Sequence, residues 1–281
     1  MSIKIIIDST TDISPRIKDR IAAVVPTTVR FGDKEYIDTV ELSRQRFYEL
    51  LFETDTMPAT SMPTPDAFAR AYEEAARDGS QVLVITISGK LSGTYQSAII
   101  AAEDFDSVTV VDSKSVAIGV GILVEFAVRL IDEGKTLEEI VAALEDKREK
   151  VAVIALLDTL EYLKKGGRIS SAVAFAGTVL NLKPVVCMHD GECNMLGKAR
   201  GSKQGNNLLI SEIEKSGGVD YSLPVMLGYT GISDALLMKY IEDSKALWEG
   251  KVDPLEFCHV SGTVGAHLGP GGVAAAFFRN E

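Results

Sequence analysis

Residues 81–98 read QVLVITISGKLSGTYQSA, and this stretch decides the fold class. Val82 to Ile87 is an apolar run rich in β-branched residues, which is typical of a strand buried on both faces, and Ser88-Gly89 ends it. From Ser92 onward the residues read as the start of a helix. The stretch is therefore a strand, a polar loop and a helix N-terminus.

This junction is suited to bind an anion, because it points backbone N–H groups and the positive end of a helix dipole at one spot. Ser92 and Thr94 add two hydroxyls on either side of Gly93. We therefore expect Ser92, Gly93 and Thr94 to hold the acidic end of a small ligand. The alternative is that Ser92 only caps its own helix, since serine is a common N-cap.

The order of elements along the chain predicts an α/β protein. In residues 1–150, buried strands alternate with helices, a pattern that predicts a mainly parallel sheet with flanking helices; the strands are expected at 3–7, 22–30, 82–87 and 108–111. In residues 151–281, a hairpin about Asp190-Gly191 and further strands predict a mixed sheet with helices. We expect two α/β domains, with a boundary near Lys150.

Two other loops carry hydroxyl groups and a cation. Thr60 and Ser61 precede Pro63 in a loop that prolines hold extended, which leaves their hydroxyls exposed to a ligand. The alternative is that they serve only as ordinary turn residues. Arg168 follows a Gly-rich turn and is either an anion ligand or a solvated loop arginine. Residues 265–272 are also rich in glycine, so they can approach a ligand closely, and His267 is the side chain there that can exchange a proton.

Composition excludes several classes of protein. The formal charge of −11 and the pI near 4.9 argue against nucleic-acid binding, which needs a basic surface. The sequence has no apolar run of about 18 residues that could span a membrane, and the N-terminus leads directly into a strand rather than a signal peptide. We expect a cytoplasmic protein.

The cysteines and the basic residues give weaker signals. The chain has three cysteines, an odd count that does not suggest a disulfide framework. A metal site at Cys187, His189 and Cys193 is imaginable, but the chain lacks the paired ligand spacing of such sites, so we expect neither metal nor cofactor. A basic patch at Arg200 and Lys203 is either a solvated face or a docking site.

Five motifs occur in order and together resemble those of the DegV family over nearly all of the chain: Thr60-Ser61-Met62-Pro63, Ser92-Gly93-Thr94-Tyr95-Gln96-Ser97, Asp112-Ser113, Gly166-Gly167-Arg168-Ile169-Ser170 and Gly265-Ala266-His267-Leu268-Gly269-Pro270-Gly271. The resemblance implies two α/β domains with a ligand tunnel between them that binds a long-chain fatty acid. Some members of that family serve as the fatty-acid-binding subunit of a bacterial fatty acid kinase. They present the carboxyl group to a separate ATP-using subunit, which makes an acyl-phosphate.

For this chain, the resemblance implies that Thr60 or Ser61, with Ser92 and the amide of Gly93, holds the carboxylate. It also implies that His267 and Arg168 complete the network. Arg200 and Lys203 could meet the kinase subunit, although Gly201, Ser202 and Gln204 interrupt the basic segment here. Contact with a membrane surface can accompany lipid exchange. Residues 172–182 and 273–278 are expected either to form the tunnel wall or to be ordinary core.

Two other functions compete with this one. The chain could be a hydrolase or acyltransferase that uses Ser92 as nucleophile and His267 as base, but it lacks a Gly-x-Ser-x-Gly elbow. It could also bind a nucleotide or sugar phosphate, but residues 89–94 lack the Walker spacing and no Gly-x-Gly-x-x-Gly follows the first strand.

Overall fold

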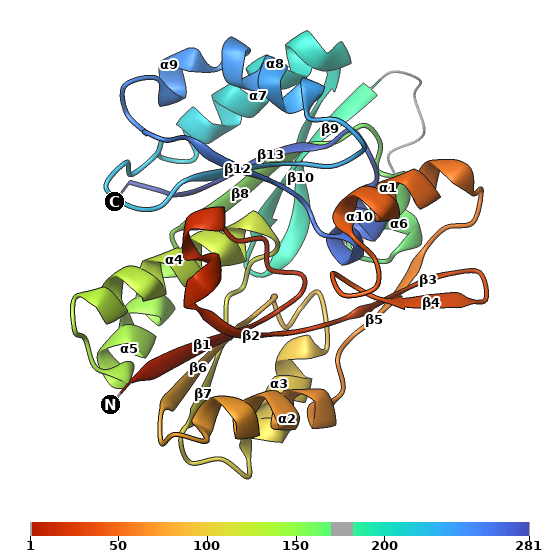
Figure 1. Cartoon of the computed structure of the whole chain (residues 1–281). Coiled ribbons are helices and arrows are strands. Elements are labelled where there is room, and N and C mark those ends of the chain that lie inside the picture. The colour runs from red at the N-terminus through yellow and green to blue at the C-terminus, as the bar shows by residue number, and fades with distance from the viewer. Residues whose placement is uncertain (1, 170–181, 281) are drawn as a thin grey trace.

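A computed structural model describes residues 2–169 and 182–280, and its strands form three sheets (Figure 1). The first sheet has the order β2-β1-β6-β7 and is parallel throughout. Its strands are β1 (Ile3–Asp8), β2 (Ile21–Val25), β6 (Gln81–Thr86) and β7 (Val108–Asp112). The helices that cover it are η1 (Pro15–Arg20), α2 (Pro65–Ala76), α3 (Thr94–Ala102), α4 (Ile118–Asp132) and α5 (Leu137–Lys147).

Strand β6 is buried on both faces, as its apolar run predicts. Val82 and Val84 pack with α2 and α3, whereas Leu83 and Ile85 pack with α4 on the other side. Because successive side chains of a strand point to opposite faces, these four residues contribute to two separate cores. This strand therefore fixes where the β6–α3 loop leaves the sheet.

The second sheet is mixed and has the order β10-β9-β8-β13-β11-β12. Only β11 and β12 pair in parallel. Its strands are β8 (Val151–Leu156), β9 (Leu182–His189), β10 (Glu192–Arg200), β11 (Met226–Tyr229), β12 (Glu256–His259) and β13 (Val273–Phe278). The later helices are α6 (Glu161–Lys165), α7 (Gly201–Lys215), α8 (Ala235–Asp243), α9 (Lys245–Trp248) and α10 (Gly262–Leu268).

A small antiparallel sheet of order β4-β3-β5 was not foreseen in full. Its strands are β3 (Thr28–Phe31), β4 (Lys34–Ile37) and β5 (Ala59–Ser61), and α1 (Arg44–Glu53) packs beside it. The expected single strand at 22–30 is wrong, because the chain leaves the first sheet at Pro26 and enters this one. The expected loop at Thr60 and Ser61 is also wrong, since both residues pair with β3.

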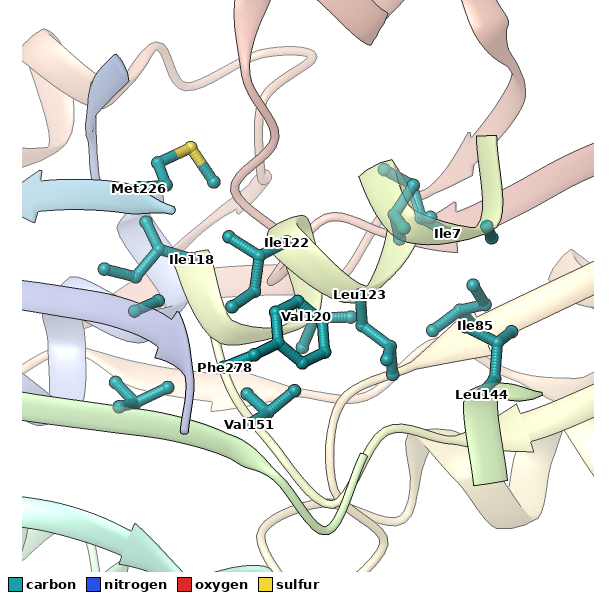
Figure 2. Close-up of a cluster of buried hydrophobic side chains, with 14 of the residues drawn as sticks. Ile7, Ile85, Ile118, Val120, Ile122, Leu123, Leu144, Val151, Met226 and Phe278 are labelled. Atoms are coloured by element: carbon teal, nitrogen blue, oxygen red, sulfur yellow. The ribbon is translucent and has the colours of Figure 1, made fainter. Parts of the chain in front are cut away.

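Helix α4 lies between the first and second sheets (Figure 2). Its side chains, among them Ile118 and Leu123, join one continuous core with Ile85 of the first sheet and Phe278 of the second. The strands before residue 113 and those after residue 150 belong to different sheets, yet they share this core. The division into domains at residue 150 stays a prediction.

None of the helices in the described ranges combines the length and the apolar character that crossing a membrane requires.

Candidate functional site

A cavity of about 480 Å³ opens where the three sheets approach one another. Its volume falls within the range of roughly 300–1,000 Å³ that is usual for small-molecule pockets. One wall comes from the loops that follow β1 and β6, the carboxyl ends of parallel strands, where ligands of α/β sheets gather. The remaining lining comes from β5, α6 and the turn after it, α10, the β9–β10 hairpin, and the segments between β2 and β3 and between β7 and α4.

The cavity is lined by both apolar and polar residues. The apolar residues are Met62, Ile87, Leu91, Val116, Leu163, Met188, Cys193, Val264 and Leu268. The polar or charged residues are Thr10, Thr27, Thr60, Ser61, Ser92, Arg168, Thr263 and His267, with Gly93 among them. A cavity of this composition suits a ligand with a long apolar part and one polar end.

Most of the predicted contact residues lie together at the solvent-facing mouth of the cavity. Ser61, Gly93 and Arg168 are exposed there, and Thr60 and Ser92 are half-buried behind them. These residues come from β5, the β6–α3 loop and the segment after α6. Their role as ligand contacts stays a prediction.

His267 lies on α10, and its Nε2 is 3.0 Å from the Thr60 hydroxyl oxygen. Burial and the nearby Arg168 charge lower the pKa of His267 from 6.5 to about 4, so the imidazole is neutral at pH 7. Its Nδ1 has no hydrogen-bond partner among the described residues. We therefore assign the proton of the neutral ring to Nε2, where it has an acceptor. The Nε2–H donates to the Thr60 hydroxyl oxygen, and the threonine O–H stays free to bind an anion.

The Gly-rich turn after α6 makes room for this histidine. A Cβ at Gly166 would lie 2.2 Å from His267 Nδ1, so no larger residue fits there. Two residues further on, Arg168 donates from Nε to the Leu91 carbonyl, at 3.2 Å, and from its terminal nitrogen to the Gly166 carbonyl, at 2.7 Å. These bonds tie the turn to the β6–α3 loop and hold a cationic group at the mouth.

The prediction for the α3 N-terminus needs two corrections. The helix begins at Thr94 with Gly93 as its N-cap, so Ser92 does not cap it in the usual way. Thr94 is fully buried and is absent from the described lining; its hydroxyl is instead 2.8 Å from the Ser92 Oγ. Thr94 thus orients Ser92 rather than touching the cavity. The Ser92 Oγ also accepts a bond from the Thr94 N–H at 3.3 Å.

A Gly-rich loop was expected around His267, but residues 262–268 form the helix α10. Its glycines serve close packing, since a Cβ at Gly265 would lie 2.5 Å from the Tyr48 hydroxyl oxygen. Helices α10, α6 and α1 lie together beside the three-stranded sheet (Figure 1). Tertiary packing therefore overrides the poor helix propensity of glycine in this segment.

Sequence reasoning missed an inner group of polar residues, Thr10, Thr27 and Thr263, which line the deep part of the cavity. Each is less than a tenth exposed. The polar run Asp8–Asp12 after the first strand was the available signal for Thr10, because it ends a strand at the ligand side of the sheet. Thr27 and Thr263 stand in no pattern that marks them.

The two expected wall segments fare differently. Strand β13 is central in the second sheet and contributes no residue to the described lining, so its assignment to the wall is wrong and it is ordinary core. In residues 172–182, the other expected wall segment, positions up to 181 lie outside the described residues.

The basic pair and the candidate metal ligands are not part of the polar mouth. Arg200 ends β10 and Lys203 is in α7; both side chains are exposed, and neither lines the cavity. Within residues 2–169 and 182–280, no group of three or more His, Cys, Asp or Glu side chains is placed to hold a metal ion.

The arrangement does not favour Ser92 as a nucleophile. The Ser92 hydroxyl is bonded to Thr94, and the His267 Nε2 is bonded to Thr60. In the described part of the chain no hydrogen bond joins Ser92 to His267, and no carboxylate orients the imidazole. The relay that activates a serine in hydrolases is therefore not assembled.

Comparison with known proteins gives matches along the whole chain. The family model of the DegV family, whose description is an uncharacterised protein, matches residues 2–280. A DegV domain-containing protein of Caldanaerobacter subterraneus is 32% identical over 284 residues, which cover 99% of each chain.

Solved structures agree with these matches. A fatty-acid-binding DegV family protein from Thermus thermophilus is similar with a TM-score of 0.88 and 34% identity, over 99% of this chain and 100% of that one. The fatty acid kinase B3 protein of Streptococcus pneumoniae, loaded with linoleic acid, is similar with a TM-score of 0.85 and 27% identity, over 100% of each chain.

Proposed function

Since the chain belongs to the DegV family, we propose that it binds a long-chain fatty acid in the cavity described above, with the carboxylate at the mouth. The observation that carries the proposal is the lining itself, which combines apolar residues with hydroxyls, an imidazole and a guanidinium gathered at the mouth. The fatty acids held by the Thermus and Streptococcus proteins support it.

The chemistry of the mouth matches an ionised carboxylate, which only accepts hydrogen bonds. Thr60 and Ser92 offer O–H groups, and Arg168 offers a positive charge in a protein whose net charge is −11. Burial of about fifteen methylenes at roughly 0.8 kcal/mol each gives on the order of 12 kcal/mol of gross transfer free energy, before the costs of binding. The acyl chain therefore supplies most of the affinity, and the polar groups fix its direction.

The first test is to extract the purified protein with organic solvent, identify the lipid by mass spectrometry, and titrate the lipid-free protein with stearic acid. Thr60→Val should weaken binding about tenfold or more, because a hydrogen bond to a charged group contributes roughly 1.5–3 kcal/mol. Thr109→Val is the matched control, since Thr109 is a partly buried strand residue that does not line the cavity. A protein that yields no lipid and binds no fatty acid would refute the proposal.

We propose further that the protein presents the carboxyl group to a separate ATP-using kinase subunit, for acyl-phosphate formation, and is not itself an enzyme. The exposure of Ser61, Gly93 and Arg168 at the mouth supports this, because a partner can reach a carboxylate held there. The exposed Arg200 and Lys203 offer the partner a basic surface.

Arg200→Ala should slow acyl-phosphate formation by a kinase subunit and leave fatty-acid affinity unchanged. Lys215→Ala is the matched control, because it also removes one exposed positive charge. Lys215 lies at the C-terminal end of α7, whereas Arg200 precedes its N-terminal end. Loss of fatty-acid affinity in Arg200→Ala would place Arg200 in the binding site instead.

A further inference from the structure

The cavity has a second polar level below its mouth. Thr263 and His267 lie four residues apart on α10, so they share one face of the helix and are separated by about 6 Å along its axis. Thr263 is 7% exposed, and its hydroxyl oxygen is 2.6 Å from that of Thr27. A ligand whose carboxylate lies beside His267 therefore passes this inner pair with its first few carbons.

The inner hydroxyls form a chain that ends at a buried carboxylate. The Thr27 Oγ1 is 2.6 Å from the Thr263 Oγ1 and 2.8 Å from the Ser9 Oγ, and the Ser9 Oγ donates to Asp38 Oδ2 at 3.4 Å. Asp38 Oδ2 also accepts the backbone N–H of Thr263 at 3.2 Å. All of these side chains are buried.

Asp38 acts as a hydrogen-bond acceptor through Oδ2. This oxygen accepts from the Ser9 Oγ, from the Thr27 Oγ1 at 3.5 Å and from the Thr263 N–H, and Oδ1 has no partner among the described residues. A proton on Oδ1 would leave Oδ2 an acceptor, so the direction of these bonds does not depend on the charge of Asp38. Burial raises the pKa of Asp38, and the charge of Arg44 acts in the opposite direction.

The accepting Oδ2 of Asp38 sets the direction of the whole chain of hydroxyls. Ser9 donates to Asp38, Thr27 donates to Ser9 or to Asp38, and in both cases Thr263 donates to Thr27. Thr263 then has no hydrogen left for the cavity and offers only an oxygen lone pair. Thr10 is arranged in the same way, because its hydroxyl donates to the buried Asp8.

We propose that this inner level binds a hydroxyl group on the acyl chain, so that the cavity favours fatty acids hydroxylated near the carboxylate. The oxygen lone pairs of Thr263 and Thr10 repel a carboxylate, but they can accept a hydrogen bond from a hydroxyl group of the ligand. The inner level therefore differs from the mouth, which offers hydrogen-bond donors. An extended chain advances about 3.3–3.6 Å per three backbone bonds, so 6 Å corresponds to about five bonds, which span carbons 1 to 5 when they are counted from a carboxylate oxygen. This inference rests on the proposed function, because it places the carboxylate at the mouth.

The experiment compares stearic acid with 3-hydroxy, 5-hydroxy and 12-hydroxystearic acids on lipid-free protein. We expect the 3-hydroxy or the 5-hydroxy acid to bind about 3- to 10-fold more tightly than stearic acid, from one added hydrogen bond. The 12-hydroxy acid should gain nothing, because its hydroxyl lies beyond Thr263. If stearic acid itself does not bind, the proposed function fails; if it binds and neither near-hydroxylated acid is preferred, the present inference is overturned.

Variants of Thr263 identify the source of the preference. Thr263→Val should remove the preference, so that the near-hydroxylated acids and stearic acid bind equally tightly to the variant, whereas Thr263→Ser should keep the preference. Thr109→Val is the control for the substitution itself. A preference that survives Thr263→Val would overturn the assignment. Should that variant not fold, Thr10→Val makes the same test from the other wall of the cavity, with the same outcomes.

Discussion

His267 combines a neutral imidazole with a position at the mouth of the cavity. Its pKa in the folded protein is lowered to about 4 by burial and by the Arg168 charge. In the unfolded chain it returns to about 6.5. As pH falls from 6.5 to 4 the unfolded chain takes up a proton that the folded protein does not, so this histidine contributes stability above pH 6.5 and loses it toward pH 4.

We therefore expect wild-type protein to lose about 2 kcal/mol more stability than His267→Gln between pH 7 and pH 4.5, since each pKa unit corresponds to about 1.36 kcal/mol. Urea unfolding of the lipid-free proteins at the two pH values measures this difference. His189→Gln is the control, because His189 is an exposed residue at the end of β9. Equal losses in wild type and His267→Gln would show that the imidazole is not held neutral.

The sequence could indicate residues of the mouth one by one but could not pair them. Thr60 and His267 are hydrogen-bonded although 207 positions separate them, and only the family resemblance joined them beforehand. Thr27 was hidden inside the expected strand at 22–30, and no pattern singled out Asp38. Their importance comes from a network across distant segments, which no local spacing encodes.

Helix α4 depends on Gly121 to reach its place between the sheets. A Cβ at Gly121 would lie 2.0 Å from the Asp12 carbonyl oxygen and 2.6 Å from the Met226 methyl carbon. The backbone at Asp12 cannot yield as a flexible side chain would. The glycine is therefore required by close approach to the backbone, not by helix conformation.

Gly121→Ala should destabilise the protein by about 1–3 kcal/mol, even though alanine improves helix propensity by about 1 kcal/mol. Gly205→Ala in α7 is the matched control, because its added Cβ would meet only the end of the Leu156 side chain. Denaturant unfolding compares the two variants. A more stable Gly121→Ala protein would mean that the helix can move away from Asp12.

At the level of elements, the sequence predicted best where burial alone decides the structure. The run expected as a strand at 82–87 forms one up to Thr86, with every side chain of 82–86 buried, and the hairpin about Asp190-Gly191 forms because both turn residues have positive φ. The sequence failed at β5 and α10. Thr60 pairs with a strand far away in the chain, and the glycines of α10 are selected by the aromatic rings packed on them.

The whole molecule has separate sheets but one continuous core through α4 (Figure 2). We therefore expect a single cooperative unfolding transition rather than two. Trp248, the one tryptophan of the chain, is buried in the core behind the second sheet and reports on that part, whereas far-UV circular dichroism reports on all helices. The two urea curves should coincide; a tryptophan transition at a distinct midpoint would show that the parts unfold independently.

The prediction of an α/β protein with a parallel sheet followed by a mixed one was correct, because alternating strands and helices constrain the topology strongly. The order of strands in the second sheet could not be predicted. There β13, the last strand of the chain, inserts between β8 and β11, and this arrangement depends on contacts between remote segments.

The cavity draws its lining from both ends of the chain, from Thr10 to Leu268. During protein synthesis the first sheet can emerge from the ribosome long before α10 does. A nascent chain accordingly has no finished cavity until α10 has emerged, so the proposed ligand can be enclosed only after that point.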